Sequence, residues 1–197
     1  MTESPDFSAL IGSRICHDLV NPISAIGNGI ELMIMGGAAR SPELALIEES
    51  VANANARIRF FRIAFGSGSD RRIARGEVLS ILSDMTQGAR ISIEWTSAAD
   101  LARRDVRLAF LAIQCFETVM PYGGTLAVAQ GADGWQITGR SSRFRVDEDL
   151  WARLAHAGAQ TDVAPAHVQF ALLPLGVAEL GRHLEMERTE TEIRLHF

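Results

Sequence analysis

The residues around His17 have types and spacings that could carry phosphoryl chemistry. A neutral imidazole nitrogen is a nucleophile near neutral pH, and Asp18 could orient the ring through the other nitrogen. Asn21, one helical turn later, could hold a water molecule or a phosphoryl oxygen, and Arg14, nearly one turn earlier, could stabilise added negative charge. These four residues form the candidate catalytic set. An exposed histidine without a function is the alternative interpretation of the same pattern.

A helical wheel places His17 at the centre of a polar stripe. At about 100° per residue, six polar residues lie within about 60° of it: Ser13, Arg14, Asn21, Ser24, Asn28 and Glu31. The opposite side is apolar, as packing in a bundle requires: Ile11, Ile15, Leu19, Ile23, Ile26, Ile30 and Met33. Pro22 removes the backbone hydrogen bond to Asp18, at a cost of about 3 kcal/mol in a helix interior. We therefore expect the helix to bend or loosen beside the histidine.

Two long helices are predicted to position this stripe. Ser-Pro-acid triplets at residues 4–6 and 41–43 each combine an N-cap, a proline at the first helical position and an acid in the first turn. The first helix is expected over residues 5–35, where two glycines follow, and the second over residues 42–65. Their short connection predicts an antiparallel hairpin. Because one hairpin cannot bury its apolar faces alone, we expect a homodimer that forms a four-helix bundle.

The second half of the chain mixes helices and strands. A Gly/Ser-rich linker separates residues 1–66, the predicted hairpin for dimerisation and phosphotransfer, from residues 71–197. Helical periodicity marks four later segments: 76–87, 105–120, 147–156 and 166–181. Asp105 is expected to cap the second of these helices, and Pro174 to interrupt the last. Alternation predicts strands at 90–97, 123–130, 134–141 and two closing strands within 182–197. The fold class is therefore α+β, with one sheet covered by helices.

Composition and charge limit the classes of function. The 197 residues are 47% hydrophobic and 22% charged, which is typical of a globular protein with a core. No run reaches the roughly 18 apolar residues of a membrane span, and the N-terminus lacks a basic signal region, so we expect a cytoplasmic protein with no membrane partner. A net charge of −5 argues against a nucleic-acid partner. The cysteines and the other histidines lack metal-ligand spacing, so no metal site is expected.

The sequence HDLVNPI at residues 17–23 resembles the phospho-acceptor box of bacterial histidine kinases. With the following NGIELM and the predicted hairpin, the chain is similar to the ChpT-type histidine phosphotransferases of alphaproteobacteria. That resemblance implies a dimer with a kinase-like hairpin, followed by an α/β-sandwich domain shaped like a histidine-kinase ATPase domain that no longer binds ATP. It also implies that His17 is the phospho-acceptor, Asp18 its acidic neighbour and Asn21 the polar residue one turn later.

The nucleotide-binding features of a working histidine kinase are missing from residues 71–197. The helix at 105–120 has no asparagine to hold magnesium, and Gln114 is the nearest substitute. No Asp-x-Gly-x-Gly turn follows the strand at 134–141, and the segment before the last helix has only Gly158 to form a lid. We therefore expect no ATP and no other bound cofactor, with the Mg²⁺ for phosphoryl transfer supplied by a partner receiver domain.

The expected function is that of a histidine phosphotransferase in a phosphorelay, with a hybrid-kinase receiver as donor and response-regulator receivers as acceptors. Residues along the first helix would form the docking site: Ile15, Leu19, Val20, Ser24 and Asn28. Three arginines could attract an acidic receiver, or could belong to an ordinary solvated loop: Arg140, Arg143 and Arg145. The alternative function is a non-enzymatic dimeric adaptor that binds and regulates kinases or receivers. Substitution of His17 distinguishes the two.

Overall fold

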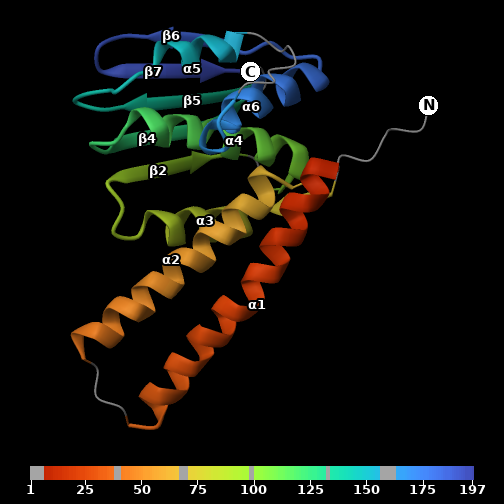
Figure 1. The fold of residues 1–197 in the computed structure, drawn as a ribbon. Helices are drawn as coiled ribbons and strands as arrows, with labels where there is room; N and C mark the ends of the chain where they lie inside the picture. Colours follow the sequence, from red (N-terminus) through yellow and green to blue (C-terminus); the bar gives the residue numbers. More distant parts are fainter. Residues whose placement is uncertain (1–6, 38–40, 67–70, 98–99, 132–133, 156–162) are drawn as a thin grey trace.

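The structure is a computed structural model that describes residues 7–37, 41–66, 71–97, 100–131, 134–155 and 163–197. For residues 7–11, 13, 14, 17 and 18 it describes the backbone alone. Most of the predicted linker, Gly158 and the first two residues of the predicted first helix lie outside these ranges. An antiparallel helical hairpin leads into helices packed on one sheet (Figure 1). The described elements have the mixed α+β composition that the sequence predicts.

The hairpin consists of α1 (Phe7–Met35) and α2 (Pro42–Ala64). Ser41 caps α2, because its hydroxyl accepts a hydrogen bond from the Leu44 N–H at 3.2 Å and a proline occupies the first helical position. After α1, the chain turns through Gly37, whose φ of 89° lies in the left-handed region that glycine adopts readily. Both helices predicted from local signals agree with the described residues.

The helices α1 and α2 approach each other closely at two levels of the hairpin. A Cβ atom added at Gly12 would lie 3.2 Å from the carbonyl oxygen of Phe65, so the backbones approach closely there. Nearer the connecting turn, a Cβ atom at Gly27 would lie 3.3 Å from a methyl carbon of Val51. Between these contacts, Cys16 of α1 is buried. The contacts fix the register of one helix on the other.

Five of the described strands form one mixed sheet in the order β2-β4-β5-β7-β6. Their bounds are β2 (Ile91–Thr96), β4 (Gly124–Gly131), β5 (Gly134–Arg140), β7 (Glu192–His196) and β6 (Glu185–Arg188). The β2–β4 pair is parallel and the other pairs are antiparallel. A separate ribbon of β1 (Arg72–Ala74) and β3 (Asp100–Ala102) was not predicted, because three residues are too few to show a periodicity.

Helices pack on this sheet and share a core with the hairpin. Their bounds are α3 (Arg75–Thr86), α4 (Arg103–Val119), α5 (Glu148–Ala152) and α6 (Gln169–Glu179), with 3-10 turns at Arg153–Ala155 and Pro165–His167. The Phe60 ring of α2 stacks on the Phe110 ring of α4, with centroids 4.4 Å apart and an interplanar angle of 5°. The second half of α2 therefore belongs to the main core, and in Figure 1 it lies beside α3. The division into residues 1–66 and 71–197 stays a prediction.

Two local predictions for the second half were wrong. Asp105 is not a helix cap, because α4 begins two residues earlier; it lies in the first turn and pairs with Arg182 at 3.1 Å. Pro174 does not interrupt α6, which continues on both sides of it. Burial of apolar neighbours such as Phe170 offsets the one backbone hydrogen bond that the proline removes. In α1 the backbone is likewise helical through Pro22.

Candidate phosphoryl-acceptor site

The predicted polar stripe lies along one face of α1. The helix is continuous, so residues seven apart lie on the same face with an offset of only about 20°. Position 17 therefore shares its face with Ser24, and Asn21 and Asn28 lie close to that line. Asn21 and Asn28 are exposed and Ser24 is partly exposed. Three predicted catalytic residues are not among the side chains that the structure describes, so their roles stay predictions: Arg14, His17 and Asp18.

A groove runs beside the polar stripe, between the two helices, and we call it the hairpin groove. Ser24 and Asn28 of α1 line it together with Glu48 and Asn55 of α2, and its volume is about 380 Å³. A second hollow of about 570 Å³ shares Glu48 and Asn55 and continues to the end of α3. Neither of these two α2 residues was predicted to belong to the site, although their spacing of seven places them on one face of α2.

Another side of the hairpin is apolar and exposed, and we call it the apolar hairpin face. Four large side chains of α1 form it and are between 46% and 56% exposed: Ile15, Leu19, Ile26 and Met33. On α2, Leu46 and Ile47 are also exposed. These four α1 residues lie about 160–180° around the helix from position 17. Ile15 and Leu19, predicted as docking residues, are thus on the side opposite to the histidine, whereas Val20 is half-buried nearer α2. None of the described helices has the length and apolarity to cross a membrane.

The three arginines at and after the end of β5 are held in different ways. Arg140 forms an ion pair with Glu192 at 2.8 Å, which neutralises its charge locally. The Arg143 guanidinium lies over the Tyr122 ring, 5.3 Å from its centroid. Arg145 is exposed. Arg140 therefore offers less charge to a partner than the sequence predicts, and Arg143 and Arg145 carry what is left of the predicted basic patch.

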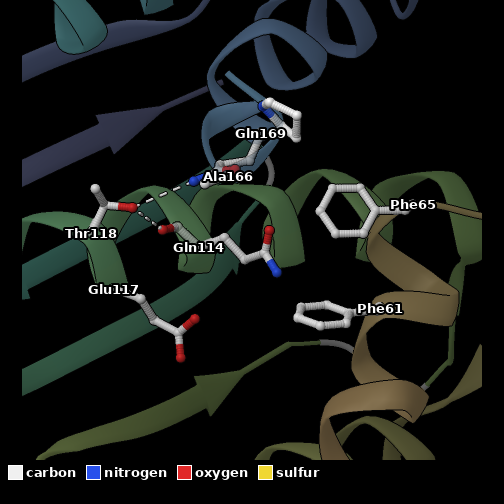
Figure 2. A pocket seen from close by; sticks show the side chains of 8 residues that line it. Phe61, Phe65, Gln114, Glu117, Thr118, Ala166 and Gln169 are labelled. Carbon is white, nitrogen blue, oxygen red and sulfur yellow. Dashed lines mark hydrogen bonds between the residues drawn. The ribbon is translucent and has the colours of Figure 1, made fainter. Parts of the chain in front are cut away.

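Figure 2 shows a pocket of about 350 Å³ where α2 meets α4 and α6, which we call the seam pocket. Phe61 of α2 and Phe65, the residue after this helix, lie across it from Gln114 of α4. Thr118 donates a hydrogen bond to the Gln114 carbonyl at 3.0 Å and accepts one from Gln169 at 3.4 Å. Among the described residues, its lining has no basic side chain: Phe61, Phe65, Gln114, Glu117, Thr118, Pro165, Ala166 and Gln169. Gln114, the nearest substitute for the magnesium-binding asparagine, thus faces two phenyl rings.

Comparison with known proteins connects this architecture to a family. Residues 75–192 match the family model of the histidine phosphotransferase C-terminal domain. The chain is also 31% identical over 195 residues to the protein phosphotransferase ChpT of Brucella abortus (strain 2308), covering 95% of this chain and 93% of that protein. The chain belongs to the histidine phosphotransferase family. A solved structure, described as the 1.7 Å structure of a bacterial phosphotransferase, matches with 28% identity and a TM-score of 0.68 over 99% of this chain and 97% of that one.

In this histidine phosphotransferase the two comparisons cover different parts. The family model begins at the first residue of α3, so the hairpin lies outside that match. The alignment with the Brucella protein covers 95% of the chain and so includes most of the hairpin. The helix that carries the polar stripe is therefore part of what this chain shares with a protein phosphotransferase.

Proposed function

We propose that this chain carries phosphoryl groups through His17 in a bacterial phosphorelay. A phosphorylated receiver domain of a hybrid histidine kinase donates the group, and response-regulator receivers accept it. The observation that best supports this function is the division of α1 into three faces. The face with position 17 is separate from the face packed on α2 and from the apolar hairpin face, so it is left for partners. Membership of the histidine phosphotransferase family supports the same chemistry.

In the proposed transfer, one bond forms as another breaks. A neutral ring nitrogen of His17 attacks the phosphorus of the partner's phospho-aspartate and forms an N–P bond. The P–O bond to the aspartate breaks, and its electron pair stays on the carboxylate. The ring then carries a positive charge until its other nitrogen releases a proton to solvent. Asp18 orients the ring, Asn21 and Arg14 contact phosphoryl oxygens, and the receiver's Mg²⁺ supplies the metal charge.

The hairpin groove is the proposed docking surface for receivers. Ser24 and Asn28 give it polar contacts on α1, and Glu48 and Asn55 give it polar contacts on α2. A receiver seated there would reach position 17 within two turns of α1, about 10 Å from Ser24 along the axis. A polar groove of this kind suits a relay, because each partner must leave after the transfer. Arg143 and Arg145 are proposed to attract the acidic rim of the receiver.

We further propose a homodimer in which two hairpins form a four-helix bundle. The apolar hairpin face supports it, because its four half-exposed apolar side chains on α1 would leave water when a second copy covers them. In this arrangement Ile15 and Leu19 pack in the dimer instead of contacting receivers. Docking then depends on Val20, Ser24 and Asn28.

We also propose that the chain binds no ATP and works in the cytoplasm, where receivers are phosphorylated. The described lining of the seam pocket supports the first point, since it offers no cation to triphosphate oxygens and places the Glu117 carboxylate there. Arg57 forms an ion pair with Glu117 at 3.1 Å, so the charge of the Arg57 guanidinium is already neutralised. Without ATP, the phosphoryl group must come from another protein.

Phosphotransfer from a purified, phosphorylated hybrid-kinase receiver tests the proposal. We expect acid-labile label on the wild type, and none on His17→Ala or on wild type given ATP alone. His183→Ala removes another exposed histidine and should keep the label. Asp18→Ala should slow the transfer without weakening receiver binding, because it removes orientation of the ring. Receiver binding without any transfer, across several receivers, would instead assign the chain to the class of non-enzymatic adaptors.

A further inference from the structure

The register of the hairpin places the end of α2 beside position 17. The two contacts Gly12–Phe65 and Gly27–Val51 lie on either side of this level. Between them the helices run antiparallel, so each step forward along α1 corresponds to one step back along α2. Position 17 is five residues beyond Gly12, which puts it level with residues 60 and 61 of α2.

Arg62 follows these two residues, about 1.5 Å further along the axis, and lies on the groove side of α2. Ser24 of α1 and Asn55 of α2 line the hairpin groove together. Position 17 is two helical turns before Ser24, so the two lie on the same face of α1. Arg62 is two turns after Asn55, so these two lie on the same face of α2. The groove-lining faces of the two helices therefore lead to position 17 and to Arg62 at the same end of the hairpin.

Arg62 differs from its neighbours on α2 in its ion pairing. Arg57 pairs with Glu117 at 3.1 Å, and Arg59 pairs with Asp84 at 2.7 Å. Arg62 is exposed and, within the described part of the chain, has no carboxylate partner. None of the described carboxylates therefore neutralises its charge at this end of the groove.

The surroundings of Arg62 are electropositive. Arg103 donates a hydrogen bond to the Arg62 carbonyl at 2.5 Å, so two guanidinium groups are held near the end of α2. Burial lowers the pKa of Arg103, and the like charge of Arg62 lowers it further. Burial raises the pKa of the Cys16 thiol, and the charge of Arg62 opposes that rise. Since Cys16 directly precedes His17 in α1, the positive charge of Arg62 acts on the turn that carries the histidine.

We propose that Arg62 is a phosphoryl-binding residue of this site. The inference rests on the proposed function. When the P–O bond of the receiver's phospho-aspartate breaks and the N–P bond to His17 forms, a group with three oxygens and about two negative charges comes to the polar face of α1. The guanidinium donates hydrogen bonds to those oxygens and neutralises part of the charge. This matters most between partners, after the first receiver has left with its magnesium.

The test measures how well the full-length protein retains the phosphoryl group. Arg62→Gln and Arg62→Lys are compared with Arg57→Gln, a matched loss of charge on another side of α2. One donor is a phosphorylated receiver. The other is phosphoramidate, a small donor that needs no docking surface, with His17→Ala as the background. We expect Arg62→Gln to shift the phosphoryl equilibrium about fivefold toward the receiver, as loss of one partly exposed charge contact would. Arg62→Lys should keep part of the effect, and Arg57→Gln should match the wild type.

A second measurement reports direct contact with the phosphoryl group. Phosphorus-31 NMR follows the pKa of the phosphoryl oxygens on His17, which a nearby cation lowers by favouring the dianion. We expect that pKa to rise in Arg62→Gln and to stay at the wild-type value in Arg57→Gln. A role limited to folding would change the far-UV circular dichroism signal and leave the phosphoryl pKa where it is.

Three outcomes would overturn the inference. A wild-type equilibrium and a wild-type phosphoryl pKa in Arg62→Gln would exclude the contact and leave the phosphotransferase function intact. Weaker receiver binding by Arg62→Gln, with normal retention of label from phosphoramidate, would assign Arg62 to docking instead. Absence of label on the wild type itself would remove the proposed function, and the role of Arg62 with it.

Discussion

Truncation of Phe60 should destabilise the hairpin and the sheet-bearing half of the chain together. Its side chain is fully buried, stacks on Phe110 with centroids 4.4 Å apart and meets Phe61 edge-on at 6.1 Å. Phe60→Ala would leave a ring-sized cavity in the core that α2 shares with α3 and α4. Changes of this kind cost about 3–5 kcal/mol. Because a protein of this size has about 5–15 kcal/mol of stability in total, the fall in the urea midpoint should be large.

Urea unfolding followed by two signals measures this change. Far-UV circular dichroism reports mainly the helices, and tryptophan fluorescence reports the buried rings Trp95, Trp135 and Trp151. In Phe60→Ala we expect both signals to report the same loss in the free energy of unfolding, about 3–5 kcal/mol. Phe61→Ala is the matched control, because that ring is only partly buried and lines the open seam pocket. Its cost should be about 1 kcal/mol.

Two results would refute the reasoning about Phe60. A loss below about 1 kcal/mol would mean that the ring does not fill the core between α2 and α4. A lower helix signal with an unchanged tryptophan transition would mean that α2 unfolds independently of the sheet and its helices. Either result would separate the hairpin from the rest of the chain energetically.

Two further predictions concern the hairpin. Ser41→Ala should cost about 1 kcal/mol, because the cap of α2 loses its hydrogen bond. The Ser41 hydroxyl also lowers the pKa of Glu43. The interaction between these two side chains therefore stabilises the folded state above the pKa that Glu43 has in the unfolded chain. This stabilisation is lost as the pH falls through the pKa of Glu43 in the folded protein. Unfolding at neutral and acidic pH should show a smaller loss in acid for the variant, and equal losses would contradict this. Ile26→Glu should make the proposed dimer monomeric in light scattering, because it puts a charge on the apolar hairpin face. Leu79→Glu on α3 should keep the wild-type mass, and a dimeric Ile26→Glu would contradict the bundle.

Local signals in the sequence determine where the two long helices begin and end. The Ser41 cap, the proline after it and the glycines after Met35 act within a few residues of the chain, so they can be read without the fold. The seven-residue repeat likewise separates the polar and apolar faces of α1. Local reasoning failed at Asp105, whose place depends on where β3 passes into α4, and at Pro174, whose helix is held by burial.

The sequence by itself determined His17 as the candidate acceptor and the polar face on which it lies. Only the tertiary structure brought Glu48 and Asn55 of α2 to that face, and it put Phe60 into the core with α4. The physical reason is the separation along the sequence of the residues that interact. Caps and helical periodicity arise from hydrogen bonds a few residues apart, whereas the register of α1 on α2 depends on packing between residues tens of positions apart, which no local pattern encodes.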